Sequence, residues 1–132
     1  MKTMTSLAAL AALLGIAGAA RAGTITSGSI PTGVNNNAAC YFRNVGTAPI
    51  RLQAQGLINF TRNFTTPSFQ NCNDIPLAPG RTCALIWNDI DDDTSFACTA
   101  DVFGNPKNIR AAAELRAPVT GGLKVVASSE LR

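Results

Sequence analysis

Short runs in which apolar and polar residues alternate recur between residues 23 and 132, separated by clusters of glycine, proline and asparagine. A period of two places the apolar side chains of a strand on one face, and the turn-forming clusters end each strand. No stretch in this range shows the long 3.6-residue apolar stripe of an amphipathic helix. The pattern therefore predicts an antiparallel all-β domain.

The clearest predicted strand is residues 96–103, and its apolar face carries Phe96, Cys98, Ala100 and Val102. Residues 109–115 alternate in the same way, and the Gly, Asn and Pro of residues 104–108 are typical of a turn. We therefore expect these strands to pair as a hairpin. The alanines of residues 111–116 also favour helix, but the run is short and Pro118 follows it, so strand is preferred.

The other strands expected from the pattern are residues 24–30, 40–45, 50–56, 81–87 and 123–128. Residues 46–49 form a turn that predicts a second hairpin, between residues 40–45 and 50–56. About seven strands at turn spacings of roughly 8 to 12 residues predict a two-sheet antiparallel sandwich.

The first 22 residues are of a different kind. Lys2 supplies a positive start, residues 7–20 form an uncharged run rich in Ala and Leu, and residues 20–22 read Ala-Arg-Ala. These are the parts of a secretory signal peptide, and the run of about 14 residues is shorter than the roughly 20 needed to cross a bilayer. We expect a cleaved signal peptide at residues 1–22 and one soluble domain at residues 23–132, located in the periplasm or outside the cell.

The net charge of the chain depends on that segment. The whole sequence has 11 basic and 8 acidic residues, but Lys2 and Arg21 lie in the expected signal peptide. Residues 23–132 then carry a net charge of only +1 and no basic cluster, which argues against nucleic acid as a partner. They also hold no second apolar run of membrane-spanning length, so we expect no membrane insertion of the mature chain.

The sequence contains no histidine, which excludes several classes of enzyme site. A Ser-His-Asp triad, a Cys-His dyad and an HExxH zinc site all need that residue. The lysines of residues 23–132 do not lie in an S-x-x-K motif either. We expect no catalytic residues and no cofactor.

Four cysteines, Cys40, Cys72, Cys83 and Cys98, lie in the part expected to be exported, where disulfides persist. Their wide spacing does not fit a zinc site. Three pairings are open from sequence alone. Because Cys40 and Cys98 lie on the apolar faces of expected strands, we favour a bridge between sheets at Cys40–Cys98 and a loop staple at Cys72–Cys83.

Residues 88–93 form an acidic segment that is the main candidate for a metal site. Asp89, Asp91 and Asp93 offer the oxygen ligands that Ca²⁺ prefers. An EF-hand loop that starts at Asp89 would need Gly at position 94 and Glu at position 100, where this chain has Thr94 and Ala100. A solvated acidic turn is the favoured interpretation. Neighbouring carboxylates on one loop are also poorly suited to glycoside hydrolysis, which needs them across a cleft.

Aromatic residues suggest two binding surfaces. The irregular segment 57–73 carries Phe60, Phe64 and Phe69, which form either a binding loop or a loop packed on its own side chains. Trp87 or Tyr41 could provide the stacking platform of a small carbohydrate-binding module, although a single Trp in a small sandwich is more often core.

Residues 40–50 (CYFRNVGTAPI), 77–83 (LAPGRTC), Cys98 and 107–111 (KNIRA) resemble a group of small uncharacterised secreted proteins of Gram-negative bacteria. The resemblance covers most of residues 23–132, and it implies an immunoglobulin-like sandwich with cysteines at similar places and export from the cytoplasm. We expect an exported, non-enzymatic interaction or structural module of the cell envelope, acting on a protein or another envelope component through loops or an exposed edge strand.

Overall fold

The structure is a computed structural model that describes residues 23–32, 36–58, 66–73, 75–90 and 95–130. The expected signal peptide, residues 1–22, lies outside the described residues. Among the described residues, no helix is long and apolar enough to cross a membrane.

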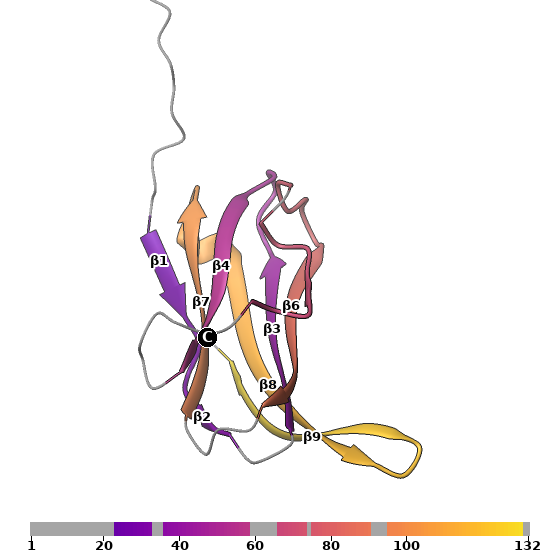
Figure 1. Cartoon of the computed structure of the whole chain (residues 1–132). Helices are drawn as coiled ribbons and strands as arrows, with labels where there is room; N and C mark the ends of the chain where they lie inside the picture. Colours follow the sequence, from indigo (N-terminus) through magenta and orange to yellow (C-terminus); the bar gives the residue numbers. More distant parts are fainter. Residues whose placement is uncertain (1–22, 33–35, 59–65, 74, 91–94, 131–132) are drawn as a thin grey trace, which may run out of the picture.

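The described chain forms two antiparallel sheets packed face to face, which confirms the predicted sandwich (Figure 1). In chain order the elements are β1 (Gly23–Thr26), β2 (Ile30–Pro31), β3 (Asn36–Asn44), β4 (Arg51–Ile58), β5 (Phe69–Gln70), β6 (Thr82–Ile90), β7 (Ser95–Phe103), the 3₁₀ turn η1 (Pro106–Asn108), β8 (Ile109–Val119) and β9 (Gly122–Glu130). All strands expected from the sequence are present, and the alanine-rich segment is the strand β8.

The smaller sheet is built around β7. One edge of β7 pairs with β4 along its whole length, and the other edge pairs with β1 and then with β2. The expected strand 24–30 is thus divided. Its midpoint stays attached to β7, because Ser27 N donates to Cys98 O at 2.8 Å and Cys98 N donates to the Ser27 hydroxyl at 2.9 Å.

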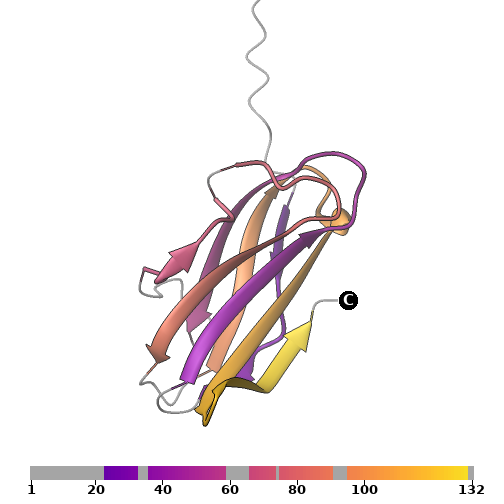
Figure 2. The same cartoon turned by 90° about the vertical axis from the view of Figure 1, so that its right-hand side faces the viewer.

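The larger sheet has the order β5-β6-β3-β8-β9. Figure 2 looks onto its outer face, where β6, β3 and β8 run side by side and β9 lies at one edge. β3 pairs with β6 on one side and with β8 on the other. β8 and β9 form a hairpin closed by Thr120 and Gly121, and Gly121 has a positive φ of 94° that favours glycine.

The two hairpins predicted from neighbouring strands are wrong. Strands 40–45 and 50–56 correspond to β3 and β4, which lie in different sheets, and the same holds for β7 and β8. Both edges of β3 and both edges of β7 are already paired, so the next strand along the chain has no edge left to join. Each connection crosses from one sheet to the other instead.

Asn44 directs the first of these crossings. Its buried side chain donates to the carbonyl oxygens of Ala48 and Leu77, each at 2.8 Å, and accepts from Gly46 N at 2.9 Å. Ile50 then exchanges two backbone hydrogen bonds with Leu77. These contacts turn the chain out of the larger sheet before β4 begins. In the second crossing the Asn105 side chain accepts from Lys107 N at 3.0 Å and caps η1.

The core lies between the two sheets and consists of the inward faces that the alternation predicts. Phe42, Phe96, Leu52, Leu85, Ile109, Leu115 and Val102 are its largest fully buried apolar side chains. Trp87 packs edge-on against Phe96 with 5.6 Å between ring centroids. Both rings lie over Gly56, where an added Cβ would be 2.9 Å from Trp87 Cη2 and 3.0 Å from Phe96 Cε2. The absence of a side chain at Gly56 therefore makes room for the aromatic pair.

Two disulfides stabilise this arrangement. Cys40 on β3 is joined to Cys98 on β7 with 5.5 Å between Cα atoms, so this bridge links the two sheets through the core. Cys72 is joined to Cys83 on β6 with 5.1 Å between Cα atoms, which holds the segment after β5 against β6. These are the two pairs favoured from the sequence. Disulfides of this kind indicate an oxidising, exported environment.

Candidate interaction surfaces

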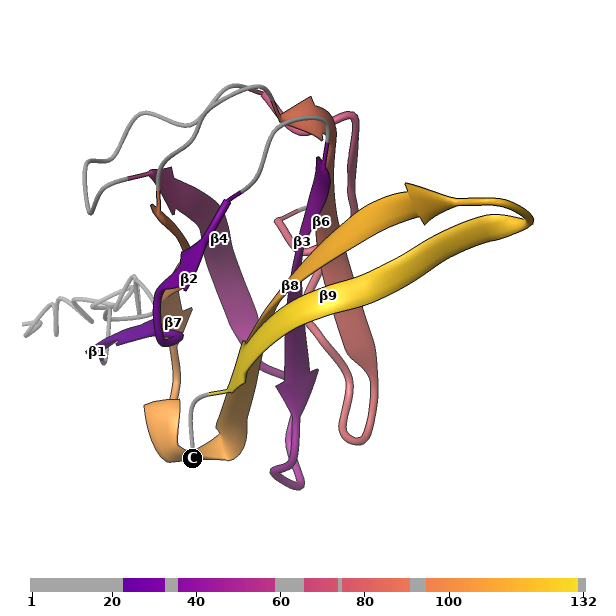
Figure 3. The same cartoon turned by 90° about the horizontal axis from the view of Figure 1, so that it is seen from below.

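The far end of the β8–β9 hairpin extends beyond the sandwich as an arm. Figure 3 shows it projecting to the right, away from the smaller sheet. We define the arm as residues 117–126. Its departure coincides with a register shift between Leu115 and Arg116, where β9 carries one extra residue. Such a bulge bends the strand and increases its twist, which turns the hairpin away from the body.

The arm exposes apolar side chains. Val119, Leu123, Val125 and Val126 have exposed fractions of 46–52%, and they are four of the seven large hydrophobic residues exposed in the described part of the chain. β9 carries two charges, at Lys124 and Glu130, and no proline. In the described structure β9 pairs with β8 on one edge and with no other strand on its second edge. An unpaired strand edge is a template for pairing with another chain, and exposed apolar clusters are typical of interaction surfaces.

A second surface lies on the outer face of the larger sheet. Cross-strand pairing sets its side chains in rows: Thr82, Arg43 and Arg110 form one row, and Ala84, Tyr41, Ala112 and Glu130 form the next. Ala112 is small and its neighbours are long, so the sheet is hollowed there. The hollow has a volume of about 670 Å³, and its lining includes Tyr41, Arg43, Val45, Thr82, Arg110, Ala112, Glu114 and Glu130. We call it the outer-face groove.

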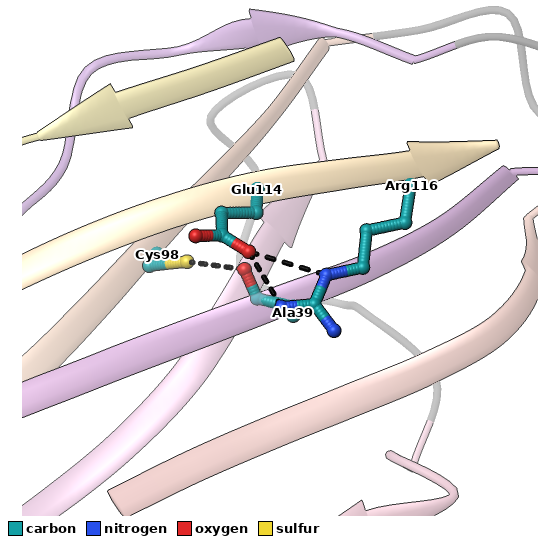
Figure 4. Close-up of polar contacts among 4 residues, drawn as sticks. All are labelled: Ala39, Cys98, Glu114 and Arg116. Carbon is teal, nitrogen blue, oxygen red and sulfur yellow. Dashed lines mark hydrogen bonds and ion pairs between the residues drawn. The ribbon is translucent and has the colours of Figure 1, made fainter. Parts of the chain in front are cut away.

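Tyr41 lies on this face beside the charged pair of Arg116 and Glu114. The Arg116 guanidinium donates from Nε and Nη2 to one carboxylate oxygen of Glu114, at 3.2 and 2.8 Å (Figure 4). Its Cζ also lies 5.5 Å from the centroid of the Tyr41 ring, a cation–π geometry. The same figure shows Cys98 Sγ near the Ala39 carbonyl oxygen, at 3.8 Å. This is a contact only, because a disulfide sulfur carries no hydrogen.

The charges around Tyr41 change its acidity. Burial raises the pKa of the Tyr41 phenol above its usual 10.0, Arg116 lowers it, and Glu114 raises it. The hydrogen bond to Glu114 raises the pKa of Arg116 above its usual value, while burial lowers it. Tyr41 is therefore a neutral phenol, and Arg116 a charged group, over the physiological pH range.

Arg43 and Arg110 stand directly opposite each other on β3 and β8. Within the described part of the chain no ion pair joins either guanidinium to a carboxylate. Arg110 Nη1 donates to the carbonyl oxygens of Lys107 and Ile109, at 2.9 and 3.3 Å, which fixes its side chain beside the groove. Two like charges in directly opposed positions repel each other, so this end of the groove has an unbalanced positive charge.

The candidate residues named from the sequence have different outcomes. Trp87 is 3% exposed and fills the core over Gly56. This confirms the favoured interpretation of Trp87 as a core residue, and the alternative, that it forms a sugar-stacking surface, is wrong. Tyr41 does border a hollow, but Arg116 covers its ring on one side. Phe69 is half exposed on β5.

The proposed calcium ligands are not tested by the structure. Asp91 and Asp93 lie outside the described residues, as do Phe60 and Phe64, and nothing is described of the Asp89 side chain. Among the described residues, no group of three or more metal-ligating side chains comes together.

The sequence pattern does not reveal the groove or the arm, although it does predict the alternating strand of residues 109–115 that carries Arg110 and Glu114. Comparison of the chain with protein-family models, with curated proteins and with solved structures finds no match.

Proposed function

We propose that this protein is an exported, non-enzymatic interaction module of the cell envelope that binds a protein partner through the arm. One observation carries the proposal: four of the seven large exposed hydrophobic residues of the described chain gather on this projecting hairpin. Exposed apolar residues scattered singly need no explanation, whereas a cluster on a projecting element indicates a binding surface.

The edge of β9 supports a specific mode of binding. An extended segment of the partner would add to β9 as a further strand, with backbone hydrogen bonds supplying affinity and the apolar side chains of the arm supplying specificity. Protected edge strands usually carry several charges or a proline. β9 has only Lys124 and Glu130, and between them lie Val125 and Val126. This edge is therefore suited to accept a strand of mixed apolar and polar sequence.

Two features of the chain support the proposed location. Two disulfides close within the described domain, which fits an oxidising compartment. Residues 1–22 have the features of a signal peptide. We propose that the mature domain works in the periplasm or outside the cell, as an immunoglobulin-like sandwich that presents the arm.

Site-specific photocrosslinking tests the proposal. A photoreactive amino acid replaces Leu123 on the arm in one variant and Ile75 in a control variant, since Ile75 is also apolar and 69% exposed but lies far along the chain from β9. Both are produced with the leader in cells that export the protein. We expect a discrete partner adduct from position 123 and none from position 75.

Two results would contradict this function. Equal adducts from both positions would indicate nonspecific contact with exposed apolar groups. No adduct from position 123, in cells where the protein is exported and oxidised, would show that the arm has no partner there.

A further inference from the structure

The outer-face groove is separate from the binding edge of β9 and has its own charge pattern. Arg43 and Arg110 form its positive end, with no carboxylate paired to either within the described chain. Glu130 stands at the other end, directly opposite Ala112, and it also has no ion-pair partner among the described residues. Unpaired charges of both signs thus lie next to the small residue Ala112 in the groove.

The geometry points to a small zwitterion as the ligand: we propose that the groove binds a carboxylate at Arg43 and Arg110 and an ammonium group at Glu130. Guanidinium groups bind a carboxylate through paired, charge-assisted hydrogen bonds, and a bound carboxylate relieves the repulsion between two opposed arginines. A carboxylate such as Glu130 accepts hydrogen bonds from an ammonium group, which has three donors.

The fold sets the spacing of the backbone positions that carry the two charged side chains. Arg110 and Glu130 are diagonal neighbours across β8 and β9, because Ala112 is the residue opposite Glu130. Diagonal neighbours have Cα atoms about 7–8 Å apart. Two residues of extended chain span roughly the same distance. The ligand class is therefore a dipeptide or an ω-amino acid of similar length.

Other side chains of the groove fit the middle of such a ligand. Ala112 provides a low floor, and Tyr41 and Val45 offer apolar surface along the side. Glu114 does not compete with Glu130 for the ammonium group, because its carboxylate already accepts two hydrogen bonds from Arg116. The site is therefore asymmetric, and it orients the ligand with the carboxylate toward Arg110.

Binding of 6-aminohexanoate to the oxidised protein tests the proposal, with hexanoate and hexylamine as ligands that each keep one charge. Amide chemical shifts of the groove residues report binding by NMR. We expect 6-aminohexanoate to bind at least fivefold more tightly than either single-charge ligand. Equal binding of hexanoate would overturn the proposal, and so would the absence of binding by all three ligands.

Single substitutions show which residues bind the carboxylate and which residue binds the ammonium group. Arg43→Gln and Arg110→Gln each should weaken binding of 6-aminohexanoate by about tenfold. Glu130→Gln should reduce its affinity to that of hexanoate. Arg51→Gln is the matched control, since Arg51 is an exposed arginine on β4 in the other sheet. Unchanged affinity in Arg43→Gln and Arg110→Gln, or an equal loss in Arg51→Gln, would overturn the assignment.

Comparison of a dipeptide with 6-aminohexanoate distinguishes between the two classes of zwitterionic ligand. Tighter binding of alanylalanine than of 6-aminohexanoate identifies short peptides as the ligand class, and the reverse order identifies free ω-amino acids; both support the site. The result is independent of the arm, because the arm is tested by photocrosslinking and none of the variants above changes residues 117–126.

Discussion

The body of the sandwich and the arm are made from similar apolar strands, but their side chains differ in how far they are buried. In β7 the inward residues Phe96, Cys98, Ala100 and Val102 are fully buried. In the arm Leu123, Val125 and Val126 are about half exposed, although they are as apolar. β7 has strands on both edges and a second sheet over one face, whereas β9, which carries these arm residues, pairs with β8 alone in the described structure. An apolar pattern therefore identifies a face that avoids water, and the topology decides what covers it.

The boundary between the two regions is sharp. The inward face of β8 is buried at Ile109, Ala111, Ala113 and Leu115, and burial ends immediately afterwards. The register shift lies at the same place. Because a bulge adds a local bend, the hairpin leaves the sandwich there instead of continuing across it. We infer that the body accounts for stability and the arm for association.

The largest effect expected from this division comes from the disulfide between the sheets. Replacing Cys40 and Cys98 by Ala opens a loop with a sequence separation of 58, and the loop-entropy relation gives a loss of about 4 kcal/mol in the free energy of unfolding. The same relation gives about 3 kcal/mol for Cys72 and Cys83, whose separation is 11. Urea unfolding of the two double variants measures both. If removal of the Cys40–Cys98 bridge cost less free energy of unfolding than removal of the Cys72–Cys83 bridge, the bridge between the sheets would not be the main covalent stabiliser of the body.

A smaller effect is expected from overpacking the core at Gly56. Gly56→Ala places a methyl group against the rings of Trp87 and Phe96, both fully enclosed, and should cost about 1–3 kcal/mol. Trp87 fluorescence reports the transition, since it is the only Trp. Phe96→Leu is the second substitution of a double-mutant cycle, because a smaller side chain leaves more room at Gly56. The double variant should therefore lose less free energy of unfolding than the sum of the losses in the two single variants. Strictly additive losses would show that the rings do not restrict this position.

The positions of the strands could be predicted from the sequence, but the order of the strands in the sheets could not. The alternation placed β3, β4, β6, β7, β8 and β9 within a few residues, because it depends only on which side chains face water. It also led to Cys40 and Cys98 as an inward-facing pair. It failed for the two hairpins, because strand order depends on long-range edges. Asn44 makes the first crossing by bonding to Leu77, which is 33 residues away in sequence, and no local pattern reveals that contact.

The candidate surfaces were harder to predict for the same reason. Tyr41 stood out in the sequence as a rare aromatic, but Arg43, Arg110 and Glu130 become neighbours only when β3, β8 and β9 pair. The sequence pattern predicts only an ordinary strand at residues 123–128, where the arm lies. Its exposure depends on the absence of a facing sheet, which is a property of the whole fold.

Tyr41 tests the electrostatics on the outer face of the body, at the base of the arm. Its pKa is above 10.0 in the folded protein, and it is the only Tyr, so ultraviolet absorbance of the phenolate reads it directly. Above pH 10 the unfolded chain releases this proton while the folded chain retains it. The Tyr41 contribution to stability is therefore present below pH 10 and lost as pH rises through the folded pKa.

Arg116 gives the variant for this measurement. Because Arg116 lowers the pKa of Tyr41, Arg116→Gln should raise it further, whereas Arg51→Gln on the other sheet should leave it unchanged. A Tyr41 midpoint that falls in Arg116→Gln would show that the guanidinium does not act on the ring as the geometry indicates.

The most direct test of the division between body and arm is the free energy of unfolding of the triple variant Leu123→Ser, Val125→Thr and Val126→Thr. If the arm is an exposed association surface, the three changes remove no core contact, and the free energy should stay within about 0.5 kcal/mol of the unchanged protein. A loss of roughly 2 kcal/mol or more, the size expected for core truncations, would contradict the account, because it would mean that these side chains hold the fold together.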